Sequence, residues 1–120
     1  MRGVVTGKRV VCVDGDGSFA MNAQELETIR RLHLNVKFFV IDNGGYDSIR
    51  KSQMNHFSRL SCDVTLPSTS ALARAYSISS KVIYHSLGLR EHIREVLDHE
   101  GPMVCTVIVS DCLMPKGATC

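Results

Sequence analysis

The chain alternates short apolar runs with longer stretches in which apolar residues recur every three or four positions. Two runs, residues 8–14 and 36–41, are rich in β-branched side chains, which is typical of strands covered on both faces of a sheet. Each run ends in a polar, glycine-rich break, Gly15-Asp16-Gly17-Ser18 after the first and Asp42-Asn43-Gly44-Gly45 after the second. Residues 19–34, between the two runs, have apolar residues at helical spacing, so this part of the chain predicts a β–α–β unit.

The rest of the chain continues this alternation. Residues 46–60 and 89–99 predict amphipathic helices, residues 71–76 a short helix, and residues 62–70, which contain Pro67, a loop. Residues 103–109 predict a third clear strand, residues 82–84 a brief one, and the tail after Asp111 irregular structure. The expected fold class is α/β, with three layers and a mostly parallel sheet that carries helices on both faces.

Composition narrows the class of protein. The 120 residues are 44% hydrophobic and 22% charged, which supports one hydrophobic core and excludes a disordered or low-complexity chain. Fourteen basic and twelve acidic residues give a net charge of +2 with mixed signs, so no nucleic-acid-binding stripe is indicated. Five cysteines without a C-x-x-C pair argue against a disulfide framework and a zinc site. No apolar stretch has the length of a membrane span, and we expect a cytoplasmic protein.

The two glycine-rich breaks contain the candidate chemistry. In a parallel sheet, ligands bind beyond the carboxyl ends of the strands. Asp16 and Asn43 follow the first two strands, and their separation of 43 − 16 = 27 residues leaves room for a turn, a helix and a return strand. If the strands are neighbours, these two side chains and a backbone carbonyl suit Mg²⁺, which prefers oxygen ligands. Gly17 and Ser18 lie where a helix begins, and free N–H groups there favour a phosphate, although Gly-Asp-Gly alone is also an ordinary strand-to-helix turn.

Over residues 7–109 the sequence resembles the C-terminal, diphosphate-binding domain of thiamine diphosphate enzymes of the acetolactate-synthase-like group. Two segments carry the resemblance, VCVDGDGSFAMNAQELETIRRL and VKFFVIDNGGY, because both halves of the cofactor signature and their spacing agree. The resemblance implies that the side chains of Asp16 and Asn43 and the carbonyl of Gly45 bind Mg²⁺. It also implies that Gly17 and Ser18 hold the diphosphate through backbone N–H groups, within a cofactor-binding set of Gly15, Asp16, Gly17, Ser18, Asn43, Gly45 and Tyr46.

The implied function is that of a 2-keto acid decarboxylase or carboligase, in which the cofactor supplies the chemistry and the protein supplies position and electrostatics. In such enzymes a glutamate from a separate pyrimidine-binding domain contacts the cofactor's aminopyrimidine ring. We therefore expect residues 1–120 to be a single partial domain of this fold, truncated on its N-terminal side and inactive alone. Its expected partner is a pyrimidine-binding domain or subunit, in a homo- or hetero-oligomer. A fragment, a split subunit and a non-catalytic relic or assembly module all stay open, and the sequence does not indicate a substrate.

One alternative belongs to another class of enzyme. The segment from Asp14 to Ser18 also resembles the D-x-D-G-[ST] opening of haloacid-dehalogenase-type phosphohydrolases, with Asp14 as nucleophile and Asp16 as general acid beside Mg²⁺. That fold also needs a lysine, a Ser or Thr at a strand tip, and a further acidic pair. The second and third strands end in Asp42-Asn43-Gly44 and Ser110-Asp111 without such a pair, so this alternative is the weaker one.

Overall fold

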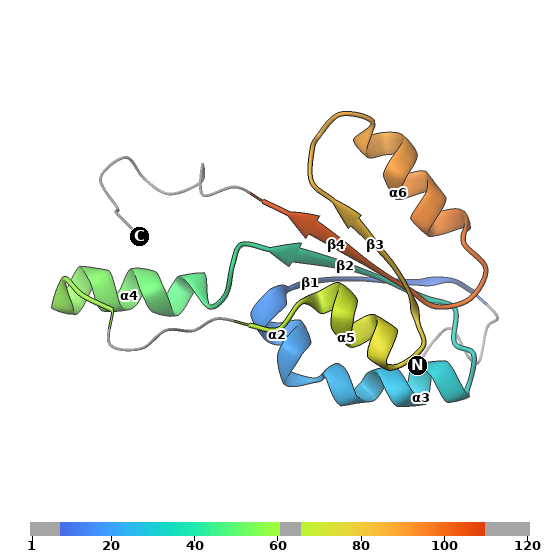
Figure 1. The fold of residues 1–120 in the computed structure, drawn as a ribbon, viewed down its shortest axis with the longest axis horizontal. Coiled ribbons are helices and arrows are strands. Elements are labelled where there is room, and N and C mark those ends of the chain that lie inside the picture. The colour runs from blue at the N-terminus through green and yellow to red at the C-terminus, as the bar shows by residue number, and fades with distance from the viewer. Residues whose placement is uncertain (1–7, 61–65, 110–120) are drawn as a thin grey trace.

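Four strands form one parallel sheet (Figure 1). The structure, a computed structural model, describes residues 8–60 and 66–109. The strands are β1 (Val10–Gly15), β2 (Val36–Asp42), β3 (Ser79–Ile83) and β4 (Met103–Ile108), and their order across the sheet is β1-β2-β4-β3. Every neighbouring pair is parallel, with Gly15 opposite Ile41 and Asp42 opposite Ile108. The carboxyl ends of β1, β2 and β4 therefore meet at one edge of the sheet.

Helices cover both faces of the sheet, as the amphipathic patterns require. The helices α2 (Asp16–Met21), α3 (Leu26–Arg31) and α5 (Thr69–Ala75) lie on one face, and α6 (Leu89–Asp98) lies on the other (Figure 1). The core of the first face includes Phe19, Leu26, Ile29, Val40, Ala73 and Val104. On the second face Val96 of α6 packs in a cluster with Phe39, Ile83 and Cys105. The predicted three-layer α/β fold is confirmed.

The single helix predicted for residues 19–34 is wrong in two respects. It begins earlier, at Asp16, and it is interrupted after Met21, where a 3-10 turn, η1 (Ala23–Glu25), leads into α3. Asn22 sits at the break with φ −123° and ψ 21°, outside the helical region. Asparagine favours such breaks because its side chain competes for backbone hydrogen bonds. Phe19 and Leu26, on either side of the interruption, both lie in the core, whereas Met21 is exposed.

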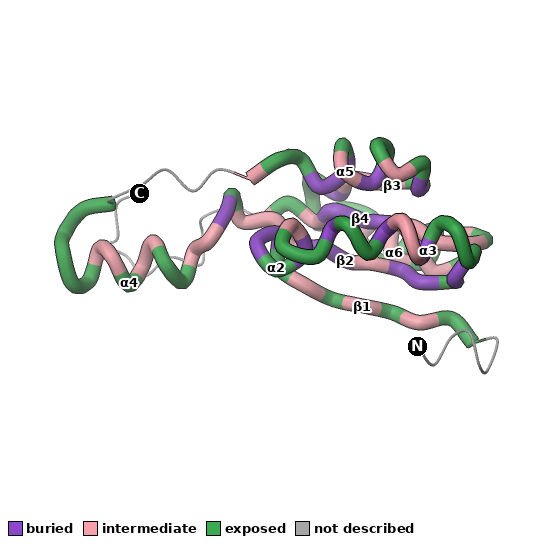
Figure 2. The backbone as a smooth tube through the Cα atoms, turned by 90° about the horizontal axis from the view of Figure 1, so that it is seen from below, coloured by how far each residue is buried: buried purple, intermediate pink, exposed green. Residues whose placement is uncertain are grey.

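The prediction that residues 8–14 are covered on both faces is also wrong. Val11 and Val13 are 49% and 68% exposed, so β1 alternates between half-buried and exposed residues (Figure 2). The reason is that α6, the helix on this face, packs against β3, β4 and the centre of β2 rather than against β1. Among the described strands, β1 pairs with β2 alone. A continuous apolar run thus lies at the edge of the sheet with one face uncovered.

The remaining boundaries differ by a few residues. The brief strand expected at residues 82–84 is β3, which begins at Ser79, and the helix expected at residues 71–76 is α5, which begins at Thr69. Ser68 caps α5, because its Oγ accepts the N–H of Ala71 at 3.3 Å. Residues 62–65 of the predicted loop and the whole tail after Asp111 lie outside the described residues, whereas Thr69 and Ser70, expected in the loop, belong to α5. Within the described part of the chain, no helix has the length and apolarity needed to cross a membrane.

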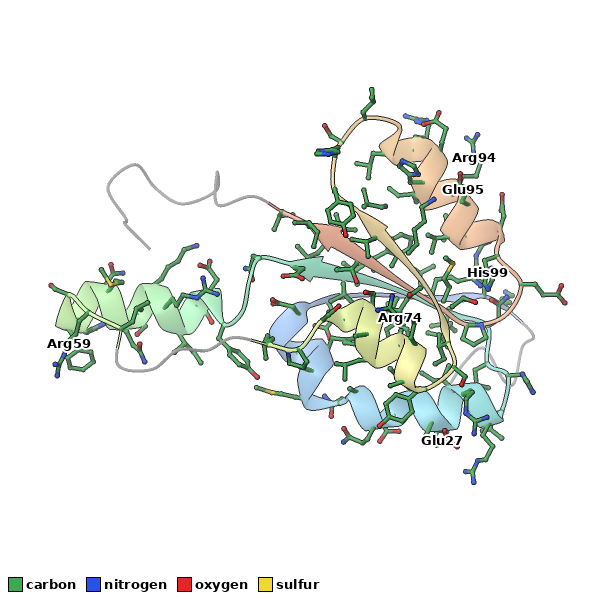
Figure 3. The ribbon with its side chains drawn as sticks, in the orientation of Figure 1. Glu27, Arg59, Arg74, Arg94, Glu95 and His99 are labelled. Carbon is green, nitrogen blue, oxygen red and sulfur yellow. The ribbon has the colours of Figure 1, made fainter. Side chains whose placement is uncertain are left out.

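The helix α4 (Asp47–Phe57) confirms that residues 46–60 contain a helix, but it buries no apolar face and does not pack on the sheet. It projects away from the sheet beyond the carboxyl end of β2, and Arg59 lies near its far end (Figures 1 and 3). None of its residues is buried. Ile49 and Phe57 are 44% and 72% exposed. Ile49 and Phe57 therefore present apolar surface to solvent within the described chain.

Candidate functional site

The site forms where β1 and β2 end side by side. Asp16 directly follows β1, and Asn43, Gly44 and Gly45 directly follow β2. The Asp16 carboxylate is 6% exposed and joins the two segments, because Oδ1 accepts the N–H of Gly17 at 2.9 Å and Oδ2 accepts the N–H of Gly45 at 2.7 Å. The structure therefore brings together two breaks that are 29 residues apart in the chain.

The amide of Asn43 lies against the same carboxylate. With its nitrogen turned inward, Asn43 donates to Asp16 Oδ1 at 3.3 Å and to the carbonyl oxygen of Gly45 at 2.8 Å. With the amide turned over, its oxygen occupies the same place, and three oxygen atoms from Asp16, Asn43 and Gly45 converge. Three converging oxygens repel one another unless a cation lies among them. In one orientation of the Asn43 amide, the oxygens of Asp16 and Gly45 accept hydrogen bonds from its nitrogen. In the other orientation, the three oxygens suit a hard cation.

The charge around Asp16 also suits a cation. Burial raises the pKa of the Asp16 carboxyl, the two backbone N–H donors oppose this shift, and the neighbouring Asp42 carboxylate adds to it. Asp16 and Asp42 both line a pocket of about 280 Å³, together with Gly44, Leu66, Pro67 and Ser68. A cation in this pocket would stabilise the charged form of both carboxylates. Within the described residues no three His, Cys, Asp or Glu side chains cluster as metal ligands, so a metal here needs amide and carbonyl oxygens as well.

Gly17 lies against Tyr46. A Cβ on Gly17 would stand 2.7 Å from Cε1 and 2.8 Å from Cδ1 of the Tyr46 ring, closer than any real contact. The absence of a side chain at Gly17 therefore lets the residue after Gly45 pack onto the first turn of α2. This contact, together with the hydrogen bond from Gly45 to Asp16, fixes the second break against the first.

The other two predicted residues lie at the edge of the site. Gly15 is exposed, with no atom within 4 Å of a hypothetical Cβ, and Ser18 is exposed on α2. The structure thus gathers Asp16, Gly17, Asn43, Gly45 and Tyr46 and leaves Gly15 and Ser18 open to solvent. The Gly17 N–H, which the resemblance assigns to the diphosphate, donates to the Asp16 carboxylate in this structure.

Sequence reasoning missed three contributors to the site. Asp42 accepts the N–H of Gly44 through Oδ1 at 2.9 Å, and Arg50 donates to the carbonyl of Gly44. Asp42 was visible within the second break, but the reach of Arg50 depends on the direction in which α4 leaves the turn. The segment 66–68 lines the pocket after a long excursion of the chain, and no local pattern indicated this.

Comparisons with known proteins identify the family of the chain. The family model described as "Thiamine pyrophosphate enzyme, C-terminal TPP binding domain" matches residues 2–107. The chain is 32% identical over 118 residues to the acetolactate synthase isozyme 2 large subunit of Escherichia coli (strain K12). It is 30% identical over 105 residues to the acetolactate synthase of Arthrospira platensis. These alignments cover 92% and 84% of this chain but 22% and 18% of the relatives, so the chain spans about a fifth of their length.

A solved structure shares the fold. It is the thiamine diphosphate-dependent 4-hydroxybenzoylformate decarboxylase of Rhodococcus jostii RHA1, with a TM-score of 0.77 and 18% identity over 89% of this chain and 21% of that one. Neither the family match nor these relatives favour the phosphohydrolase alternative. The match covers most of the chain, including both halves of the site, and the predicted resemblance is confirmed: the chain belongs to the family of C-terminal thiamine pyrophosphate-binding domains of thiamine pyrophosphate enzymes.

Proposed function

We propose that this chain binds the diphosphate of thiamine diphosphate through Mg²⁺ held by Asp16, Asn43 and the carbonyl of Gly45. The observation that carries the proposal is the convergence of these three groups, which come from two strand ends and meet around one buried carboxylate. The donor set is one carboxylate, one amide and one carbonyl. Mg²⁺ commonly takes few protein ligands and completes its shell with phosphate oxygens and water.

The residues around the ligands have supporting roles in this proposal. Asp16 supplies the negative charge that attracts the cation, and its hydrogen bond to the Gly45 N–H holds the adjacent Gly45 carbonyl beside it. Gly17 admits the Tyr46 ring, and the exposed Ser18 lies at the start of α2, where backbone N–H groups favour phosphate. The segment from Tyr46 along α4 would lie beside the cofactor's rings. The bound cofactor supplies the carbanion chemistry by which such enzymes decarboxylate or ligate 2-keto acids.

The proposal includes a partner, a pyrimidine-binding domain or subunit that completes an acetolactate-synthase-like enzyme. Two uncovered surfaces support it: α4, which has no buried residue, and the face of β1 that exposes Val11 and Val13. Apolar surface of this kind commonly marks a protein interface. Without the partner, we expect this chain to bind cofactor and to have no decarboxylase or carboligase activity.

Calorimetric titration of thiamine diphosphate into the purified chain with Mg²⁺ tests the proposal. Wild-type protein is expected to show saturable binding that chelation of Mg²⁺ removes and that Asp16→Ala and Asn43→Ala abolish. Asp14→Ala is the matched control, because Asp14 lies two residues from Asp16 but its Oδ1 accepts only the adjacent Gly15 N–H among the contacts described. Circular dichroism shows whether each variant is folded. A folded wild-type chain without binding, or equal binding by Asp16→Ala, would refute the proposal.

A further inference from the structure

The turn between β2 and α4 carries two of the three proposed ligands in an uncommon backbone conformation. Gly44 and Gly45 have φ values of +83° and +127°, a region that residues other than glycine rarely adopt. Glycine reaches this region easily but also leaves it easily, because it has no side chain to restrict its backbone. Two glycines in succession therefore do not by themselves fix the direction of the Gly45 carbonyl or the place of the Asn43 side chain.

Side chains on both sides of the turn hold its central peptide groups. Asp42, the last residue of β2, accepts the N–H of Gly44 through Oδ1 at 2.9 Å. Arg50, in the first half of α4, donates through Nη2 to the carbonyl of Gly44. Both polar groups of Gly44 thus have a charged partner, and hydrogen bonds to charged groups are stronger than neutral ones. The next N–H, that of Gly45, is held by Asp16.

We propose that Asp42 and Arg50 are positioning residues, which hold the turn so that Asn43 and the Gly45 carbonyl face Asp16. This inference rests on the proposed function, because it concerns the affinity of the same site for Mg²⁺ and diphosphate. Asp42 acts through the Gly44 N–H and Arg50 through the Gly44 carbonyl, and neither belongs to the proposed ligand set. Residues that orient metal ligands in this way typically change metal affinity by ~10–100-fold when they are lost.

The two contacts act on one turn, which makes their effects interdependent. When either contact is lost, the turn is already partly free, so the second loss adds less than it would in the wild-type chain. The double variant Asp42→Ala with Arg50→Ala is therefore expected to bind more tightly than the product of the two single effects implies. Two residues acting separately on stability would instead show additive effects.

The test measures binding and local backbone opening in the same variants. Calorimetry with Mg²⁺ and thiamine diphosphate is expected to show ~10-fold or greater weakening for Asp42→Ala and for Arg50→Ala. Asp42→Asn retains an oxygen that accepts the Gly44 N–H but loses the negative charge beside the pocket, so we expect it to weaken binding clearly less than Asp42→Ala does. Lys51→Ala is the matched control, since Lys51 is the next residue of α4 and its side chain pairs with the Asp47 carboxylate at 2.7 Å rather than with Gly44. NMR hydrogen exchange without cofactor is expected to be faster at the Gly44 amide in Asp42→Ala, and unchanged in Lys51→Ala.

The outcomes separate this inference from the proposed function. A folded wild-type chain that binds no cofactor overturns both. Wild-type binding that Asp16→Ala abolishes, with Asp42→Ala and Arg50→Ala equal to wild type, overturns the inference alone. Equal losses in Asp42→Asn and Asp42→Ala would show that the charge of Asp42 acts on the cation rather than its hydrogen bond on the turn. That result also overturns the positioning role.

Discussion

Substitution of Gly17 tests the contact that joins the two halves of the site. In Gly17→Ala the new Cβ would lie 2.7 Å from Cε1 and 2.8 Å from Cδ1 of Tyr46. Ordinary carbon–carbon contacts lie at roughly 3.5–4.0 Å, so the ring must move by about 1 Å. Overpacking of this kind costs about 1–3 kcal/mol. Alanine recovers up to about 1 kcal/mol of helix propensity over glycine in α2. We expect a net loss of about 1–2 kcal/mol in the free energy of unfolding.

The matched background for this substitution is Tyr46→Ala, which removes the ring. There, Gly17→Ala meets no obstacle and retains only the gain in helix propensity, so it is expected to be neutral or stabilising by up to about 1 kcal/mol. Urea unfolding of the four proteins, followed by circular dichroism, gives the coupling between the two positions. The reasoning is refuted if Gly17→Ala destabilises the chain equally with and without the Tyr46 ring.

Three further predictions concern the sheet. The exposed face of β1 predicts self-association, so light scattering of the isolated chain should show oligomers that Val11→Ser with Val13→Ser reduces; a monomeric wild type contradicts this. Burial raises the pKa of the Cys105 thiol to about 11, so below that pH the thiol stays protonated and unreactive. Peptide mapping after alkylation at pH 8 should find Cys105 modified only in unfolded protein, and labelling of the native protein refutes this. Lys37 is fully buried and donates to two backbone carbonyls after α6. Lys37→Met leaves these carbonyls without this donor and should lower the free energy of unfolding in urea by about 2–4 kcal/mol. A variant with wild-type stability contradicts this.

The sequence was sufficient to predict the β–α–β unit from local periodicity, and the rule for parallel strands predicted that Asp16 and Asn43 meet if the two strands are neighbours, which the pairing of β1 with β2 confirms. It was not sufficient to predict which faces of β1 are covered. Val11 and Val13 have the composition of buried strand residues, but their exposure depends on where α6 packs, which is a property of the whole sheet. The contact of Arg50 with Gly44 was missed for a similar reason, since it depends on the direction of α4 after the turn.

The order of the strands has a consequence for how the site is assembled during folding. The pairing of β1 with β2 closes a short loop, since Val10 pairs with Val36. The pairing of β2 with β4, in which Lys37 pairs with Met103, closes a much longer one. The second pairing spans 103 − 37 = 66 residues, and contacts this distant form slowly because of the loop-closure entropy that they require. The N–H of Val109, just beyond β4, then donates to the carbonyl of Asp42 at 2.9 Å. A newly made chain can thus form the two strands that bear the candidate ligands early, but the end of β2 is secured only when the last described strand arrives.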